Sequence, residues 1–533
     1  MTSRIAATLL AALAAAHPIT AQAPPPVTAR VIDAHLRYLA DDLLEGRAPA
    51  TRGGRLAARY IAAQFQALGL VPAADGSYFQ PVALIGTTSR ATLAWTQRAG
   101  TAPLRFGDDF VAWAERPDTQ IAVDAEVVFV GYGISAPESR WDDYKGINLQ
   151  GKILLMLVND PGLQDSTVFR GKELTYYGRW TYKLEEAARR GAAGAIIIHT
   201  TGSATYGWAV VRGSWTVEQF TLDPPPTPSL AFGSWITSEA ATAALATRGY
   251  SLDSLTRAAA RRDFRPMTTG LRALVTVTSS VRRVESDNVV GLLPGTDPAL
   301  RNEPVVFTAH YDHKGIGPAV NGDSIYNGAE DNASGVAAVL AAAEALARSG
   351  QQSRRPMLFI ATTAEESGLL GSEAYAARPL FPLARTAAVL NLDVTNTRGA
   401  TRDLGSLGGD RSALGALFTA AALAESLTPQ GDPDPTRGSF FRSDHFPFVR
   451  AGVPALSLEP GQNFVGRPAG WGKEQDELYN DKRYHQPDDE YSASFNYDGM
   501  VQQIRVALRV ALAVGNAESL PEWLPGAEFR RPR

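Results

Sequence analysis

The sequence contains no cysteine in its 533 residues. This absence excludes disulfide bonds, thiolate zinc sites and cysteine nucleophiles together, so any bound metal must be held by imidazole and carboxylate groups. An excess of basic charge is also missing, because the formal net charge is -4 and acidic and basic residues are spread along the chain. Without a basic stripe, the sequence predicts neither nucleic acid nor an anionic bilayer as a partner.

Long apolar runs are missing too, except at the N-terminus. There, Arg4 precedes an apolar run over residues 5–16, and small residues follow up to Ala23. This layout is typical of a secretory signal peptide, which we place at residues 1–23, with a retained anchor as the alternative. No other segment approaches the roughly 20 apolar residues of a membrane-spanning helix. We therefore expect an exported protein, periplasmic or extracellular, that has no membrane contact beyond the export signal.

The length and the hydrophobic fraction of 45% allow one large domain and a smaller one. Apolar spacing predicts two opening helices, over 32–43 and 57–68. Compact apolar runs at 127–134 and 153–158 then indicate a small β-rich unit, which we end near Pro266. Beyond it, strands alternate with helices, which predicts an α/β domain with a largely parallel, helix-covered sheet. The expected units are a signal peptide at 1–23, the large domain at 24–117 and 266–520, an inserted unit at 118–265 and a tail at 521–533.

Five short segments carry side chains of the kind that bind divalent metals. They are His310 to His313, Glu330 to Gly335, Glu365 to Gly368, Asn391 to Asp393, and Tyr484 to His485. In an α/β sheet, ligands gather where the strands end at their carboxyl edge. Three of the candidates lie at or just past such an end: His310, Glu365 and Asp393. The motif positions and the expected fold therefore agree.

Taken singly, most of these residues also have a structural explanation. His310 ends a strand, and Asp312 lies two residues on, where its carboxylate can fix the tautomer of the imidazole. Asp331 precedes a helix, so its carboxylate alone would be explained as an N-cap. Asp393 closes an apolar strand and His485 lies in a polar loop. None of these positions decides the chemistry by itself.

The adjacent pair Glu365 and Glu366 follows an apolar strand and precedes Gly368. Two like charges at a tight, partly buried turn cost free energy unless a cation binds one of them. The alternative interpretation of the pair is two solvated acids on the surface. One glutamate can coordinate a metal while its neighbour takes a proton from water. Taken together, the candidates provide one bridging carboxylate, two imidazoles and two further carboxylates. That composition predicts a pair of zinc ions with three protein ligands each.

The ordered motifs resemble those of the di-zinc exopeptidases, a group that includes bacterial leucyl aminopeptidase, the Streptomyces-type aminopeptidase, glutamate carboxypeptidase II and the transferrin receptor. The resemblance also includes the segment Ser443 to Phe448 and runs through most of the chain. It implies a three-layer α/β/α catalytic domain with a mixed, mostly parallel sheet. The region around Val127 to Lys152 resembles the β-rich protease-associated domain that several members carry inserted in the catalytic fold.

Carried over by position, the resemblance implies two Zn²⁺ per chain. His310 and Asp393 would hold one ion, Glu366 and His485 the other, and Asp331 would bridge both. Glu365 would activate a metal-bridging water as general base.

Three further residues have weaker roles in this resemblance. Tyr484 would stabilise the oxyanion, and Asp444 and His445 would support the ligands or touch the substrate. The resemblance also implies a cis peptide bond between Asp331 and Asn332. Peptides are the expected substrates, and the oligomeric state is left open.

Which end of the peptide is recognised also stays open. An aminopeptidase needs an acidic recess for the substrate ammonium, whereas a carboxypeptidase uses basic and tyrosine side chains. Arg437 and Arg442 would suit the mouth of either site, although solvated loop charges explain them as well. We favour an aminopeptidase, with a glutamate-carboxypeptidase-like enzyme second. More distant alternatives are a glutaminyl cyclase and a non-catalytic, receptor-like binding protein.

Overall fold

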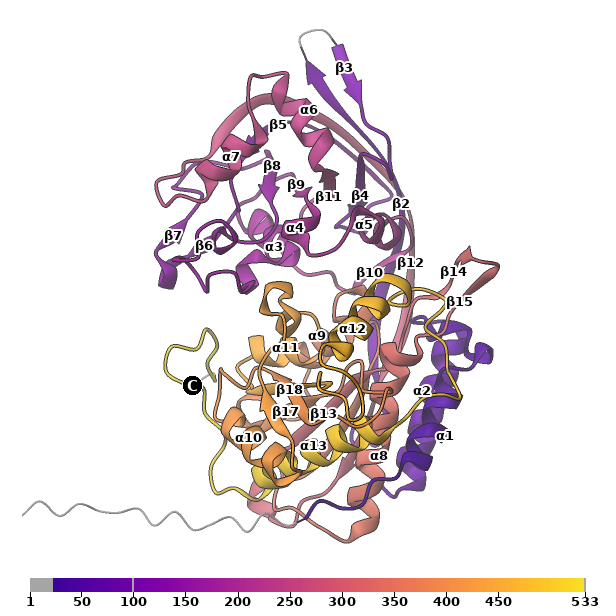
Figure 1. Cartoon of the computed structure of the whole chain (residues 1–533). Helices are drawn as coiled ribbons and strands as arrows, with labels where there is room; N and C mark the ends of the chain where they lie inside the picture. The colour runs from indigo at the N-terminus through magenta and orange to yellow at the C-terminus, as the bar shows by residue number, and fades with distance from the viewer. Residues whose placement is uncertain (1–22, 98–99, 532–533) are drawn as a thin grey trace, which may run out of the picture.

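The computed structural model describes residues 23–97 and 100–531, so most of the expected signal peptide lies outside the described residues. The chain forms a large lobe and a small lobe, which two long strands connect (Figure 1). One continuous sheet of 16 strands runs through both lobes. No helix among the described residues is long and apolar enough to cross a membrane.

The large lobe is built on a mixed, mostly parallel sheet, as the sequence predicted. Its strands follow the order β19, β18, β20, β17, β13, β16 and β12. The neighbours of β13 and the pair β17 and β20 are parallel, whereas β12 and β18 join their neighbours β16 and β20 in antiparallel fashion. The bounds are β12 Met267–Leu293, β13 Val305–His310, β16 Met357–Thr362, β17 Ala388–Asn391, β18 Asp403–Leu407, β19 Thr428–Gln430 and β20 Ala455–Glu459.

Helices cover both faces of this sheet, which makes the three-layer α/β/α arrangement. The first face packs against apolar stripes of five helices and buries, for example, Phe65, Val339 and Leu508. Those helices are α1 Ala29–Leu39, α2 Arg52–Ala67, α8 Ser334–Ser349, α10 Leu414–Ala424 and α13 Asp498–Asn516. The second face packs against α9 (Leu370–Ala377) and α11 (His445–Arg450). The helix α12 (Trp471–Lys482) leads into the segment that carries His485.

The small lobe extends the same sheet beyond β12. Parallel strands β5, β8, β9 and β11 follow one another, and β4 closes the edge by pairing antiparallel to β11. Its strands are β3 Gly100–Pro103, β4 Phe110–Ala114, β5 Gln120–Phe129, β8 Ile153–Leu157, β9 Gly194–His199 and β11 Phe232–Thr237. Its helices are α3 Trp180–Arg189, α4 Thr201–Ala204, α5 Trp208–Trp215, α6 Ser238–Ala246 and α7 Leu252–Ala259. Their apolar residues form cores separate from those of the large lobe.

Two long strands link the lobes. β2 (Phe79–Gln97) and β12 pair antiparallel from Phe79 and Val289 in the large lobe to Thr96 and Arg272 in the small lobe. β12 is one strand of 27 residues. Its polar middle section is tolerated because it lies in this connecting ribbon and keeps its hydrogen bonds to β2.

Shorter elements complete the chain. Small strands are β1 Val71–Pro72, β6 Ser135–Ala136, β7 Trp141–Asp142, β10 Gln219–Leu222, β14 Gly315–Val320 and β15 Asp323–Tyr326. The first predicted helix ends earlier than expected, at Leu39, and Leu43 lies 76% exposed in a 3-10 turn over Asp42–Arg47. The side chain of Asp41 caps this turn and so separates it from α1. The predicted boundary between 117 and 118 stays a prediction, although β4, at 110–114, lies in the small lobe.

Candidate metal centre

The predicted ligands meet at the carboxyl edge of the large-lobe sheet. His310 is the last residue of β13, and Glu365 and Glu366 follow β16 by a few residues. Asp393 lies two residues beyond β17, next to β13 in the sheet. Asp331 lies in a short helical turn, Ala329–Ala333, just before α8. His485 arrives from the C-terminal part of the chain after α12.

Asp331 lies between two imidazoles. Its Oδ1 atom is 3.2 Å from Nε2 of His310, and its Oδ2 atom is 3.3 Å from Nε2 of His485. The two oxygens of one carboxylate therefore face two different groups of side chains. This is the arrangement that a bridging carboxylate requires.

The first group contains His310, Asp331 and Asp393, whose ligand atoms lie within 4.8 Å of one another. Nε2 of His310 is 3.3 Å from Oδ1 of Asp393. The other oxygen of Asp393 accepts a hydrogen bond of 2.5 Å from the hydroxyl of Ser443, which in turn accepts one from Asn391. Ser443 thus orients Asp393, a role that the sequence analysis did not assign to it.

Asp312 differs from its predicted role. Its backbone carbonyl oxygen, not its carboxylate, lies nearest to Nδ1 of His310, at 3.1 Å. The nearer carboxylate oxygen is 3.9 Å from that nitrogen and accepts a hydrogen bond from the backbone N–H of Glu365. Asp312 therefore positions Glu365 as well as His310.

The second group offers two imidazoles beside Glu366. Nε2 of His485 lies 3.1 Å from Oε2 of Glu366, and Nδ1 of His313 lies 2.6 Å from Oε1 of the same carboxylate. The set His313, Asp331 and Glu366 also has its ligand atoms within 4.8 Å of one another. Lys314 Nζ lies 2.9 Å from Oε2 of Glu366. His313 and Lys314 had no expected role, although both adjoin the predicted His310 motif.

The two adjacent glutamates have opposite electrostatic surroundings. Burial and the negative charge of Glu366 raise the pKa of Glu365 well above its usual value, against the lowering effect of His310. Burial acts in the same direction on Glu366, but the positive charges of His485 and Lys314 hold its pKa well below the usual value. Glu366 therefore favours the charged form that a metal ligand needs, and Glu365 is the carboxyl group with high proton affinity.

The loop that carries Asp331 is held by several buried contacts. The carboxylate of Asp489 accepts hydrogen bonds of 3.0 Å from the backbone N–H groups of Glu330 and Asp331. The guanidinium of Arg47 donates to the carbonyl oxygens of Tyr311 and Gly328, at 2.7 and 2.9 Å. The peptide bond between Asp331 and Asn332 is cis, as predicted. The backbone around Asp331 is thus fixed from two distant parts of the chain.

The three weaker predictions have different outcomes. Tyr484 is 38% exposed and stacks on the ring of His485 at a centroid distance of 3.8 Å. Asp444 is fully buried and accepts hydrogen bonds from Thr362 and Ser372, so it supports the end of β16. His445 is fully buried against Phe440, and neither ring nitrogen has a hydrogen-bond partner among the described residues. The two roles predicted for Asp444 and His445, support of the ligands or contact with the substrate, stay predictions.

The donor set fits a pair of divalent cations. Several carboxylates converge in a buried space. Their nearby positive or ionisable partners are Lys314 and the imidazoles. Such a concentration of negative charge is costly without cations. Those carboxylates belong to Asp312, Asp331, Glu365, Glu366 and Asp393. Imidazole and carboxylate donors without sulfur suit zinc.

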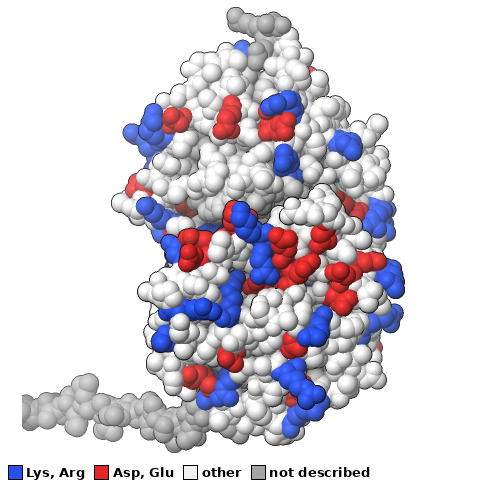
Figure 2. All heavy atoms as spheres, turned by 45° about the vertical axis from the view of Figure 1, so that its right-hand side comes forward, with Lys and Arg blue, Asp and Glu red and all other residues white. Residues whose placement is uncertain are grey.

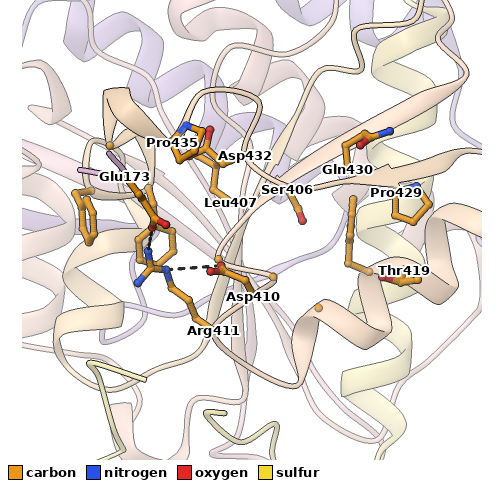
Figure 3. Close-up of a pocket in the computed structure, with 18 of the residues that line it drawn as sticks. Glu173, Ser406, Leu407, Asp410, Arg411, Thr419, Pro429, Gln430, Asp432 and Pro435 are labelled. Atoms are coloured by element: carbon orange, nitrogen blue, oxygen red, sulfur yellow. Dashed lines mark hydrogen bonds and ion pairs between the residues drawn. The ribbon is translucent and has the colours of Figure 1, made fainter. Parts of the chain in front are cut away.

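A cavity of about 480 Å³ lies elsewhere, where the small lobe meets the large one (Figure 3). Glu173 and Leu174 of the small lobe line it together with Ser406, Arg411 and Phe440. Arg411 points toward Glu173, at 2.9 Å, and none of the predicted ligands lines this cavity. The functional site is therefore assigned to the cluster of predicted ligands and not to this cavity.

The fold and the cluster define an α/β domain that gathers metal-binding side chains at the carboxyl edge of its sheet. Residues 288–511, which contain every predicted ligand, match the model of Peptidase family M28. The resemblance inferred from the motifs is therefore confirmed, and this segment is assigned to that family.

The chain is also similar to individual proteins. Over 206 residues, or 37% of the chain, the sequence is 29% identical to leupeptin-inactivating enzyme 1 of Streptomyces exfoliatus, of which 42% is covered. An aminopeptidase from Aneurinibacillus sp. strain AM-1 has a similar fold, with a TM-score of 0.51 and 20% identity over 95% of this chain and 98% of that chain. A zinc aminopeptidase from Bacillus subtilis aligns with a TM-score of 0.46 and 19% identity, over 93% and 97% of the two chains.

Proposed function

We propose that this protein is a zinc-dependent aminopeptidase that removes N-terminal residues from peptides. The observation that carries the proposal is the pair of side-chain groups that share Asp331, one containing His310 and Asp393 and the other Glu366 and His485. The match to Peptidase family M28 supports hydrolysis of a peptide bond. The aminopeptidase with a similar fold is in keeping with release from the N-terminus.

Two Zn²⁺ per chain would be held by these two groups. His310, Asp331 and Asp393 would bind one ion, and Asp331, Glu366 and His485 the other. We assign His485 in preference to His313 because its Nε2 atom lies between two carboxylates, whereas Nδ1 of His313 is close to Glu366 alone. His313 would then orient Glu366 through its other oxygen.

The chemistry that bound zinc would supply here is polarisation of the scissile carbonyl and a lower pKa of water. Glu365, the carboxyl group with high proton affinity, takes the proton of the attacking water and delivers it to the leaving amine. Its backbone N–H is anchored by Asp312, which keeps the carboxyl group near the cluster. The hydroxyl of Tyr484, on a ring stacked against His485, is suited to donate a hydrogen bond to the oxyanion.

Glu459 supports recognition of an N-terminal ammonium. It ends β20, which pairs in parallel with β17, the strand that precedes Asp393. Among the described residues, no cationic side chain forms an ion pair with Glu459. Burial and the negative charges of Asp393, Asp432 and Asp476 raise its pKa to about 8. A substrate ammonium would relieve this repulsion and complete an acidic recess beside the metal centre.

The proposed activity is tested by release of p-nitroaniline from leucine p-nitroanilide and its N-acetylated form. We expect cleavage of the unblocked substrate only, loss of activity with a chelator, and recovery on addition of zinc. Cleavage of both forms would contradict recognition of a free N-terminus. No cleavage of either form by the zinc-loaded protein would reject the aminopeptidase proposal in favour of a carboxypeptidase, to be tested with C-terminal glutamate peptides.

Replacing Glu459 with glutamine is expected to raise KM for leucine p-nitroanilide about tenfold. The change removes a charge-assisted hydrogen bond to the substrate ammonium while leaving the predicted ligands in place. Steady-state kinetics measure the effect, and Glu518→Gln, an exposed site near the C-terminus, is the matched control. An unchanged KM in Glu459→Gln would remove this residue from ammonium binding.

Two wider predictions belong to the same proposal. The small lobe would be an inserted protease-associated domain, which limits access to the metal centre. The N-terminal segment would direct export to the periplasm or the medium. Mass spectrometry of the N-terminus after expression in a secreting host would test the second of these.

A further inference from the structure

Glu330 is a buried carboxylate between two arginines. It immediately precedes Asp331 in the chain and is 1% exposed. Nη1 of Arg483 donates to its Oε1 atom at 2.7 Å, and Nη2 of Arg398 donates to its Oε2 atom at 3.0 Å. Acidic and basic side chains also lie next to one another on the surface, at the waist between the lobes (Figure 2). Exposed ion pairs of that kind contribute little free energy, whereas removal of one partner of a buried pair is costly.

Arg483 joins the segment that carries His485 to Glu330. It lies two residues before His485 in the chain. Its guanidinium also contacts the chain on the other side of His485, because Nε donates to the carbonyl oxygen of Asp488 at 3.0 Å and Nη2 to that of Glu490 at 3.3 Å. One side chain therefore closes the chain around His485 and fixes this segment to Glu330.

His485 needs such support because its backbone has an uncommon conformation. Its φ angle is 56°, in the left-handed region, which costs free energy for a residue with a Cβ atom and persists only where the surrounding structure holds it. Nε2 of His485 lies 3.3 Å from Oδ2 of Asp331, the residue that follows Glu330. The ion pair between Glu330 and Arg483 therefore relates the position of one expected ligand to that of another.

Arg398 connects Glu330 to the helix α12. Its Nη1 atom donates to Oδ1 of Asp476 in α12 at 2.6 Å, while its Nη2 atom contacts Glu330. Asp393 lies five residues before Arg398, but its carboxylate is oriented separately by the hydroxyl of Ser443. The position of Asp393 therefore depends less on Glu330 than the position of the segment after α12 does.

We propose that Glu330 is a positioning residue for the second group of ligands, Asp331, Glu366 and His485. Through Arg483, it sets the distance between Asp331 and His485 and thereby the zinc affinity of that group. This inference rests on the proposed two-zinc peptidase and concerns how the second ion is retained. Groups that hold metal ligands in place typically contribute about 10- to 100-fold to metal affinity. The first group contains no residue of the segment after α12, so its affinity should change little.

The two zinc dissociation constants of the wild type and of Glu330→Gln test this proposal. Competition with a chelator, starting from the zinc-loaded proteins, measures both constants. Glutamine keeps the size of the side chain but removes the charge that binds the two arginines. We expect one constant to rise by about 10- to 100-fold and the other to change by less than about threefold. Two unchanged constants, or two constants that rise equally, would overturn the proposal.

His485→Ala shows whether the effect of Glu330 passes through His485. When the imidazole is already absent, the addition of Glu330→Gln should change neither remaining constant by more than about threefold, because the two substitutions remove the same contribution. A larger further rise in the double variant would contradict a role through His485 and indicate a general effect on the metal centre.

Arg483→Gln changes the other partner of the ion pair, at a position that is partly exposed. It should raise the same zinc constant by a similar factor. The double variant Glu330→Gln, Arg483→Gln should not exceed the larger of the two single effects, because the two residues act as one pair. If Glu330→Gln does not fold, Arg483→Gln decides the question, and unchanged zinc constants in it would overturn the proposal.

Glu425→Gln is the matched control for the loss of a paired carboxylate. Glu425 follows the last residue of α10. Like Glu330, it accepts hydrogen bonds from two arginines, Arg505 and Arg509 of α13. Loss of its charge should lower the unfolding temperature and leave both zinc constants at their wild-type values. Equal zinc constants in Glu425→Gln and Glu330→Gln would give Glu330 a structural role alone.

Zinc binding separates this inference from the peptidase function. The constants are measured without substrate, so they test Glu330 even if the protein with two bound zinc ions cleaves no leucine p-nitroanilide. In that case the aminopeptidase proposal fails, and a selective rise of one constant in Glu330→Gln still supports the positioning role. A wild-type protein that binds no zinc would reject both proposals.

Discussion

Replacement of Glu365 by glutamine is expected to lower kcat by about 10²- to 10⁴-fold, the usual contribution of a general base. The amide keeps the size and shape of the carboxyl group but cannot take a proton from the attacking water. Glu365 is 11% exposed, and its nearer oxygen lies 3.9 Å from Nε2 of His310, so it borders the cluster without being enclosed by it. Release of p-nitroaniline from leucine p-nitroanilide measures the loss.

The zinc content of the variant distinguishes the loss of a general base from the loss of a metal ligand. Elemental analysis of Glu365→Gln should give the same zinc per chain as the wild type, because the proposed ligands are unchanged. Glu474→Gln, an exposed site in the first turn of α12, should match the wild type in both rate and metal. A variant that retains wild-type kcat would exclude Glu365 as the base, and one that loses zinc would identify it as a ligand.

The sequence predicted the arrangement of the candidate ligands well, because their positions depend on local patterns. Each apolar run that precedes His310, Glu365 and Asp393 forms a strand, and parallel strands end at the same edge of the sheet. The order of strands did not need to be known for these side chains to be expected near one another. Asp331 was expected as a ligand from the resemblance of its motif, because its place just before a long apolar helix alone indicated an N-cap.

The supporting residues could not be predicted in the same way. Arg47 contacts Tyr311 and Gly328, which are 264 and 281 positions away in the chain. Asp489 holds the backbone of Asp331 across 158 positions. No local periodicity reports such contacts, because they arise only when distant segments pack. His313 and Ser443 lay inside recognised motifs, and only the structure reveals which carboxylate each one touches.

Arg442 shows the same limit at the level of the two lobes. In the sequence it appeared as a loop charge, and a solvated surface explained it equally well. In the structure its guanidinium donates to the hydroxyl of Thr205 in the small lobe, 237 positions away in the chain. This contact arises only when the lobes pack together.

Replacement of Asp331 by asparagine is expected to lower kcat/KM by about 10³-fold or more and to reduce bound zinc from two ions to less than one per chain. Metal ions contribute several kcal/mol to transition-state stabilisation in such hydrolases, and each 1.36 kcal/mol is a factor of ten in rate. Asp331 is the side chain whose two oxygens face both groups. Asparagine at this position has one neutral oxygen and one NH₂ group, so it can offer an oxygen to only one of the two groups of ligands.

Asp393→Asn provides the matched comparison, because Asp393 belongs to the first group alone. This variant should retain about one zinc ion per chain, held by Asp331, Glu366 and His485. Asp253→Asn, at an exposed position in α7 of the small lobe, should retain two. A bridging carboxylate requires a larger loss of metal in Asp331→Asn than in Asp393→Asn. Equal zinc contents in these two variants would contradict a shared ligand, and two ions in Asp331→Asn would assign the metals to other side chains.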